Sequence, residues 1–408
     1  MPLVCTKLAQ VDEHSGTHAM KSEPIQILFI VSSLCVGGAE KHTVALANHL
    51  NSDRFESHLC YLKPVEALLP QVRAELRQRI LSLNVKRRID MAAARALRRY
   101  IEERDIDVVV TTNEYPVLYA QLALTGCKHP PRLIQVFHTT DLDRLKSKIQ
   151  MLLYRPLFRR CDLLVFVSDK QRQHWHEKAL YGKRDIVIHN GVDLQRFQGY
   201  ADMAQQVATR QALGLSEGTY VVGICAAFRP EKAHVDLLEA LQRLHARGIE
   251  ATALFIGDGS ERRNIEARIG ALKLGESVII TGFKADVRPF LSICDVVALT
   301  SHAVETFSIA ALEAMAMGKP LVLTRIGGAE EQVIEGQNGF LFEAGDIPAL
   351  TGALSKLQDP ALRETMGLAS RQRVESLFSE QRMFARFEAE IEGLARARAR
   401  RDRTASRL

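Results

Sequence analysis

Several features that mark large classes of proteins are missing from this 408-residue sequence. No apolar run approaches the ~20 residues that a membrane-spanning helix needs. Residues 1–23 carry Asp12, Glu13 and His14 where a secretory signal would need an apolar core, so we read them as a polar, flexible leader. No recognisable nucleic-acid-binding module or aromatic stacking motif occurs, so nucleic acid is not an expected partner. These absences favour a cytoplasmic protein.

Cysteine usage excludes two further classes. The seven cysteines are odd in number and include no Cys-x-x-Cys pair, which predicts neither a disulfide framework nor a zinc motif. Cys60, Cys225 and Cys294 lie within or beside strand-like runs, where a free thiol behaves as a small core residue. We therefore expect reduced thiols in a reducing compartment.

The composition is that of a globular protein with an uneven charge. The contents of 47% hydrophobic and 25% charged residues are ordinary for a globular protein. A chain of 408 residues is longer than one hydrophobic core usually serves, so two domains are expected. Residues 1–200 hold 29 Lys and Arg against 21 Asp and Glu, residues 201–394 are net acidic, and the last 14 residues are basic again. Residues 144–160 interleave cations with apolar residues as a basic amphipathic helix does, with Pro156 kinking or ending it. Such a helix either contacts an anionic membrane surface or packs on the core; both interpretations stay open.

Strand-sized apolar runs alternate with helix-sized segments along the whole chain. The candidate strands are 25–31, 57–62, 107–111, 133–137, 163–167 and 186–189, then 220–225, 252–256, 277–281, 296–299 and 320–323. Strands separated by helices form parallel sheets, and ligands bind at the carboxyl ends of such strands. Because residues 193–218 carry no strand signal, we expect an α/β fold with two Rossmann-like, doubly wound parallel-sheet domains facing a central cleft.

Residues 305–320 carry the most specific signal. A polar loop with Glu305 leads into a short Ala-rich helix with Glu313, which ends at a Gly-Lys-Pro stop. The helix N-terminus, near the amides of Phe307 and Ser308, offers free N–H groups to an anion. The two carboxylates would bind hydroxyls on either side, so the predicted ligand combines sugar, phosphate and ribose. The alternative is a surface Glu followed by a half-buried helical Glu.

At this point the chain resembles the retaining nucleotide-sugar glycosyltransferases of glycosyltransferase family 4, which have the GT-B fold. The hallmark of that family, two Glu residues separated by seven others, corresponds here to Glu305 and Glu313 in a Glu-Thr-Phe-Ser setting. The resemblance implies that Glu305 contacts the donor sugar and Glu313 the ribose hydroxyls. It also implies that the last helix crosses back to the first domain.

Cationic and imidazole side chains follow other predicted strands. Arg229 and Lys232 lie three apart after a central strand, where they can neutralise a departing diphosphate as a metal does in other folds. The resemblance implies the same role, and the alternative for Arg229 is a surface salt bridge with Glu231. His138 ends another strand, and the resemblance places it against the donor sugar and the reacting carbon.

Two glycine loops fit the same cleft. Gly37 and Gly38 follow the first strand and open a helix, so their backbone can approach a phosphate closely, although the Gly-x-Gly-x-x-Gly spacing is absent. The resemblance places this loop and the one at Gly257 beside the donor. The alternatives are a tight turn at Gly37 and an ordinary strand-to-helix turn at Gly257.

The acceptor side is less defined. Asn113, Glu114 and Tyr115 follow a strand of the first domain and are expected to face the acceptor. A rival interpretation comes from Asp141 and Asp143, because Asp-x-Asp after a strand is how GT-A transferases hold manganese. A single GT-A domain would leave the second half of the chain unexplained, so no metal or other cofactor is expected.

The residues and the resemblance together predict a retaining, metal-independent hexosyltransferase. It would move a sugar from a nucleoside diphosphate, UDP first among the bases, to a glycan or lipid-linked acceptor in polysaccharide or glycolipid biosynthesis. A catalytically silent nucleotide-sugar-binding partner and a GT-B-fold epimerase are the alternatives. The protein could lie peripherally on the cytoplasmic membrane face through residues 144–160. Base, sugar, linkage and oligomeric state stay open.

The domain boundaries follow from the strand pattern and the resemblance. We expect a leader at 1–23, an N-terminal acceptor-side domain at 24–195, a linker at 196–218, a C-terminal nucleotide-sugar domain at 219–378, a returning helix at 379–394 and a basic tail at 395–408.

Overall fold

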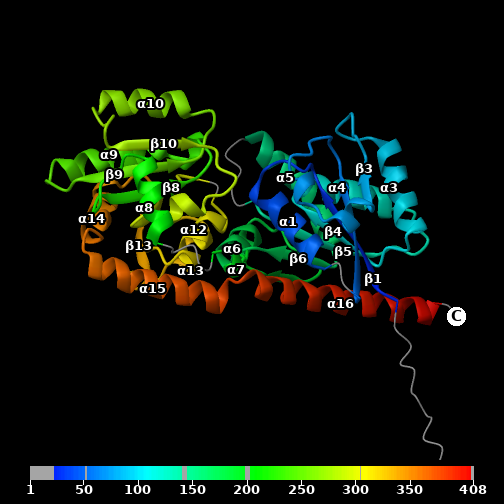
Figure 1. The fold of residues 1–408 in the computed structure, drawn as a ribbon. Coiled ribbons are helices and arrows are strands. Elements are labelled where there is room, and N and C mark those ends of the chain that lie inside the picture. The colour runs from blue at the N-terminus through cyan, green and yellow to red at the C-terminus, as the bar shows by residue number, and fades with distance from the viewer. Residues whose placement is uncertain (1–22, 51–52, 140–144, 198–202, 304, 406–408) are drawn as a thin grey trace, which may run out of the picture.

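The computed structural model describes residues 23–50, 53–139, 145–197, 203–303 and 305–405. Two α/β domains lie beside each other, and two long helices, α15 (Pro360–Leu377) and α16 (Glu380–Ala405), run along the lower edge of both (Figure 1). Both sheets consist of parallel strands, seven in the N-terminal domain and six in the C-terminal domain. The predicted architecture of two doubly wound domains is therefore confirmed.

The N-terminal sheet has the strand order β3-β2-β1-β4-β5-β6-β7. Its strands are β1 (Ile25–Val31), β2 (Phe55–Tyr61), β3 (Ile80–Ser82), β4 (Val108–Thr112), β5 (Arg132–Phe137), β6 (Leu163–Phe166) and β7 (Asp185–Val187). Its helices are α1 (Gly38–His49), α2 (Ala74–Arg77), α3 (Met91–Glu103), α4 (Glu114–Leu124), α5 (Leu145–Arg159) and α6 (Asp169–Glu177). Successive strands are added on one side of β1 up to β3 and on its other side from β4 onward, so the loops after β1 and β4 open the crevice in which ligands bind.

The C-terminal sheet repeats this plan in the order β10-β9-β8-β11-β12-β13. Its strands are β8 (Tyr220–Cys225), β9 (Ala251–Ile256), β10 (Val278–Gly282), β11 (Val296–Leu299), β12 (Leu321–Thr324) and β13 (Gly339–Phe342). Its helices are α9 (His234–His245), α10 (Arg262–Ala271), α11 (Arg288–Ser292), α12 (Ile309–Ala316), α13 (Ala329–Gln332) and α14 (Ile347–Lys356). Here the switch lies between β8 and β11, so the loops after those two strands face the crevice.

The strands read as continuous apolar runs because both faces of each sheet are covered. In β1, Ile27 and Phe29 pack into a core that includes α1 and α16, whereas Leu28 and Ile30 point to the opposite core, which includes α3, α4 and α5. In the second sheet, α12 and α15 contribute to one core and α9, α10 and α14 to the other. This burial explains why the eleven predicted strands coincide with β1, β2, β4 to β7 and β8 to β12 within one or two residues.

Two strands were missed in the sequence. β3 has three residues and β13 has four, and both are edge strands whose side chains are partly exposed. Apolar runs as short as these cannot be told from helix segments or loops by periodicity. In its described residues, 196–197 and 203–218, the segment predicted as a linker contains no strand. It carries the C-terminal end of α7 (Leu194–Phe197) and all of α8 (Met203–Ala212).

The C-terminal helix continues further than predicted. Residues 395–405 were expected to form a basic tail, but they belong to α16. The reason is that Arg398 is buried and pairs with Asp105 and Asp107 of the N-terminal domain, with 2.9 and 2.5 Å between charged atoms. Upstream, Phe384, Phe387 and Ile391 of the same helix pack into the core around β1, as the helical spacing of apolar residues predicts.

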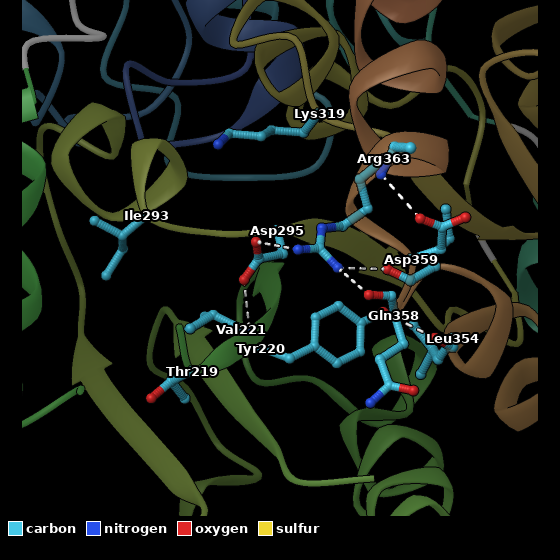
Figure 2. Close-up of polar contacts among 12 residues, drawn as sticks. Thr219, Tyr220, Val221, Ile293, Asp295, Lys319, Leu354, Gln358, Asp359 and Arg363 are labelled. Atoms are coloured by element: carbon cyan, nitrogen blue, oxygen red, sulfur yellow. Dashed lines mark hydrogen bonds and ion pairs between the residues drawn. The ribbon is translucent and has the colours of Figure 1, made fainter. Parts of the chain in front are cut away.

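A polar network attaches α15 to the C-terminal sheet on the edge away from the cleft (Figure 2). Asp295, at the start of β11, accepts a hydrogen bond of 2.8 Å from the amide of Val221 and pairs with Arg363 of α15 at 3.4 Å. Tyr220 donates from its hydroxyl to the carbonyl of Leu354 at 2.9 Å.

Among the described residues, none of the helices has both the length and the hydropathy of a membrane span.

Candidate active site

A cavity of about 530 Å³ opens between the two domains at the carboxyl ends of their strands. It is lined by residues 35–40 after β1, Asn113 after β4, His138 and Thr139 after β5, Asn190, the β8 loop with Cys225, Ala226, Arg229 and Lys232, and the β11 loop with Leu299 and residues 305–310. The loops at both topological switch points thus meet in one cleft.

The cleft brings together nine of the thirteen residues predicted from the sequence. These are Gly37, Gly38, Asn113, His138, Arg229, Lys232, Glu305, Phe307 and Ser308. Gly257, Glu313, Glu114 and Tyr115 do not line this cavity. Asp141 and Asp143, the rival metal ligands, lie outside the described residues.

Lys232 and Glu305 form an ion pair at the centre of the C-terminal side. The Lys232 Nζ lies 2.5 Å from Glu305 Oε2, and the hydroxyl of Ser301 donates to the same oxygen at 3.1 Å. Lys232 ends a 3₁₀ turn, Pro230–Lys232, whose following residue Ala233 has a left-handed φ of 45°. Thr300 anchors that turn by donating to the carbonyls of Lys232 and Ala233. Arg229, in contrast, extends into solvent, 4.0 Å from Glu231.

The helix predicted after Glu305 is α12, and its first turn faces the cavity. Ser308 caps it by accepting from the amide of Ala311 at 3.2 Å, which leaves the preceding amides without an intrahelical partner. The loop before it is held from outside the helix: Asn190 donates to the carbonyl of Phe307 at 3.0 Å, and Gln332 donates to that of Ser308 at 2.8 Å. Side chains from outside the helix thus hold the loop that leads into it.

A second helix N-terminus converges on the same space. Gly38 is the first residue of α1, and a Cβ built on it would lie 3.5 Å from the side chain of Ile309, the first residue of α12. The first turns of α1 and α12, one from each domain, thus line the same cavity, and each offers the positive end of a helix dipole. This arrangement favours an anion between them.

His138 contributes a neutral ring to the N-terminal wall. Burial lowers its pKa well below the ordinary value, and the neighbouring His42 lowers it further. Its backbone amide donates to Asn113 Oδ1 at 3.0 Å, and its carbonyl accepts from Thr306 of the other domain at 2.6 Å. Within the described residues, its Nε2 atom is buried without a hydrogen-bond partner.

His42 was missed in the sequence, although it packs edge-on against His138 with ring centroids 5.1 Å apart. It lies in α1, contacts Phe387 of α16 and is fully buried, so that burial lowers its pKa to about 4. Its place on the apolar face of a predicted helix was the only available signal, and that place marks a core residue as readily as a site residue.

Four of the predicted residues lie outside the cavity lining. A Cβ on Gly257 would lie 2.0 Å from the carbonyl oxygen of Ala226, so glycine is needed for that loop to pass behind the lining. Glu313 is half-buried in α12; burial raises its pKa, and Lys41 and Arg196 oppose the rise. Burial also raises the pKa of Glu114. The hydroxyl of Tyr115 donates to carbonyls of the β3–α3 loop.

One group of described residues, Asp169, His189 and Glu331, has its ligand atoms close enough for a metal ion. These residues do not line the cleft. The Glu331 carboxylate already accepts hydrogen bonds from the amides of Asp169 and Lys170 and pairs with His189.

Two family models match the chain, and their boundary coincides with the break between the domains. Residues 36–196 match Glycosyltransferase Family 4, and residues 205–373 match Glycosyl transferases group 1. The chain therefore belongs to the family 4 type of glycosyltransferases. The family assignment expected from the two Glu residues and their setting is thereby confirmed.

Two proteins with named activities are similar in sequence to this glycosyltransferase over more than half of its length. N-acetyl-alpha-D-glucosaminyl L-malate synthase of Bacillus anthracis is 26% identical over 302 residues, which cover 73% of this chain and 78% of the relative. A GDP-mannose-dependent alpha-(1-6)-phosphatidylinositol monomannoside mannosyltransferase of Mycolicibacterium smegmatis is 28% identical over 68% of this chain and 74% of its own.

Solved structures identify the fold of the glycosyltransferase as GT-B. Anabaena Alr3699/HepE in complex with UDP superposes with a TM-score of 0.79 at 22% identity, covering 90% of this chain and all of that one. Sucrose-phosphate synthase from Thermosynechococcus elongatus superposes with a TM-score of 0.75 at 20% identity, covering 91% and 100%.

Proposed function

We propose that this glycosyltransferase transfers a sugar from a nucleoside diphosphate to a glycan or lipid-linked acceptor, retains the anomeric configuration and needs no metal. The observation that carries the proposal is that the Lys232–Glu305 pair lines one cavity together with the first turns of α1 and α12. Cation, carboxylate and free amides then match the leaving group, the sugar hydroxyls and the phosphates of one donor.

Charge on the leaving group is the main demand of the reaction. The amides of α12 would bind phosphate oxygens, while Lys232 and the exposed Arg229 neutralise the diphosphate as the sugar leaves. A charge-assisted hydrogen bond contributes ~1.5–3 kcal/mol. A contact that forms fully only in the transition state and contributes ~2.7 kcal/mol accelerates the step about a hundredfold.

Retention is proposed to follow a same-face substitution. The bond between the anomeric carbon and the diphosphate oxygen breaks, the bond to the acceptor oxygen forms on the same face, and the acceptor proton passes to the leaving phosphate. Glu305 is proposed to orient the sugar hydroxyls while Lys232 holds its carboxylate in place. The neutral ring of His138 would contact the sugar beside the reacting carbon.

Glu313 is proposed to hold the ribose. It belongs to α12, whose first residues, Ile309 and Ala310, line the cavity. UDP is the first base to test because the related Alr3699/HepE was solved with UDP, whereas another relative is named as GDP-mannose-dependent.

A panel of UDP-, GDP- and ADP-sugars in EDTA tests donor binding by thermal stabilisation. A ligand at ~100 times its dissociation constant stabilises a protein by about 2.7 kcal/mol. We expect one nucleotide class to stabilise the wild type and to lose its effect in Glu313→Ala. Stabilisation only with manganese would contradict metal independence. Binding without any release of nucleotide in the presence of acceptors would favour the silent-partner alternative.

A further inference from the structure

The floor of the cleft contains hydrogen bonds that join the two domains directly. Thr306, between Glu305 and Phe307, donates from its hydroxyl to the carbonyl of His138 at 2.6 Å. Thr306 thus connects the loop carrying the Glu305 carboxylate to the loop carrying the imidazole opposite it. The carbonyl of Thr306 in turn accepts from the amide of Gly328, which precedes the short helix α13.

Helix α13 carries two neighbouring side chains that act on different domains. Gln332 donates to the carbonyl of Ser308, at the N-terminus of α12. Glu331 reaches across to the N-terminal domain, where its two oxygens accept from the amides of Asp169 and Lys170 at 3.0 and 3.1 Å. The short helix is therefore bonded at once to the proposed phosphate site and to the opposite domain.

Glu331 completes the capping of α6. The first amides of a helix lack intrahelical partners. In α6, the side chain of Ser168 accepts from the amide of Gln171, and Glu331 accepts from the two amides before it. His189 also donates to Glu331, at 2.8 Å. Burial acts to raise the pKa of Glu331, but these hydrogen bonds outweigh burial and lower that pKa below its ordinary value.

We propose that Thr306 and Glu331 are positioning residues that hold the two halves of the reaction site in register across the domain seam. Thr306 sets the position of His138 relative to the Lys232–Glu305 pair, and Glu331 sets the position of α6 relative to α13. Close backbone approach at the seam supports this assignment: a Cβ on Gly328 would lie 3.0 Å from the Cβ of Ser168 and 2.9 Å from the carbonyl oxygen of Thr306.

The seam contact of Glu331 is tested without any substrate by hydrogen–deuterium exchange of the full chain. In Glu331→Ala, we expect the amides at the start of α6 to exchange at least about tenfold faster than in the wild type, because they lose their acceptor. In Glu331→Gln, which keeps one carbonyl acceptor, the exchange rate of these amides is expected to lie between those of the wild type and Glu331→Ala. Glu330→Ala is the matched control, since Glu330 neighbours Glu331 but pairs with Arg325 of its own domain. Unchanged exchange in Glu331→Ala would overturn the role of Glu331.

The effect on the reaction rests on the proposed function and is measured separately, with whichever nucleotide sugar stabilises the wild type. Thr306→Val should lower kcat about tenfold while the donor KM changes less than about twofold, and Thr306→Ser should restore kcat. Glu331→Ala should also lower kcat, and Glu330→Ala should not. Full kcat in Thr306→Val, or in Glu331→Ala with fast exchange, would overturn positioning. A wild type without turnover would contradict the proposed function and leave the exchange result decisive for the seam.

Discussion

The ammonium group of Lys232 lies 2.5 Å from the carboxylate of Glu305, although 72 residues separate them in the chain. Both side chains are about one-fifth exposed, so the pair borders the cleft without being isolated from solvent. Because the two residues follow adjacent parallel strands, β8 and β11, the topology itself brings them together. The same pairing makes it possible to separate catalytic loss from structural loss.

Replacing Lys232 with Ala should lower turnover about a hundredfold, because the cation no longer offsets charge on the diphosphate. The variant also leaves the Glu305 carboxylate with the Ser301 hydroxyl but without its cation, which would lower the melting temperature. The double variant Lys232→Ala/Glu305→Gln should recover the melting temperature without recovering turnover. Calorimetry and nucleotide-release assays on both variants distinguish the effects. Parallel recovery of stability and turnover would assign Lys232 a structural role only.

Gly327→Ala should disturb the β11 loop. Gly327 has a left-handed φ of 53°, and a Cβ there would lie 1.5 Å from the carbonyl oxygen of Glu305. Gly336→Ala is the matched control, because Gly336 has a φ of 75° but no atom within 4 Å of the built Cβ. Both variants carry backbone strain of ~1 kcal/mol or more. Denaturant unfolding should show a clearly larger loss for Gly327→Ala, and donor binding should weaken in that variant alone. Equal losses would contradict the close approach.

The buried histidine His42 should make stability depend on pH. Its pKa is about 4 in the folded protein, against ~6.5 in an unfolded chain, so the unfolded state binds more protons between these values. The free energy of unfolding should therefore be highest above pH ~6.5 and fall as the pH drops toward 4. In His42→Gln, the slope in this window should decrease by up to ~1.4 kcal/mol per pH unit. An unchanged slope would contradict the burial of an unprotonated His42.

Helix α5 should decide whether the protein contacts an anionic membrane. Leu152 and Leu153 are 55% and 68% exposed, and cations on the same helix flank them. Replacing both with Glu should reduce sedimentation with phosphatidylglycerol vesicles several-fold, because apolar insertion and charge attraction are both lost. Leu368→Glu is the control, since Leu368 is 60% exposed on α15 of the other domain. No vesicle binding by the wild type would favour the core-packing interpretation of this helix.

Most of the fold could be predicted from local sequence patterns. Strands buried on both faces must be apolar throughout, so β1 and β8 were readable to the residue. The short edge strands β3 and β13 were not, because an apolar run of three or four residues does not by itself distinguish a strand from a helix segment or a loop. The C-terminal helix was misjudged for a different reason. Its Arg-rich end is stabilised by Asp105 and Asp107, which lie almost 300 residues earlier in the chain.

What the sequence by itself determined is the chemistry available at each loop: a Glu before a helix N-terminus, an Arg and a Lys after β8, glycines after β1 and a His after β5. Their types, spacing and place at strand ends follow from the chain alone, since strand direction dictates which loops lie at the carboxyl edge. Only the tertiary structure decided which of them meet. In the folded protein, Lys232 pairs with Glu305 and the ring of His42 packs against that of His138. Thr306 and Glu331 form hydrogen bonds to the N-terminal domain. Contacts between separate domains depend on packing that no local pattern encodes, because hydrogen bonds and ion pairs form wherever the folded backbone brings their partners within reach.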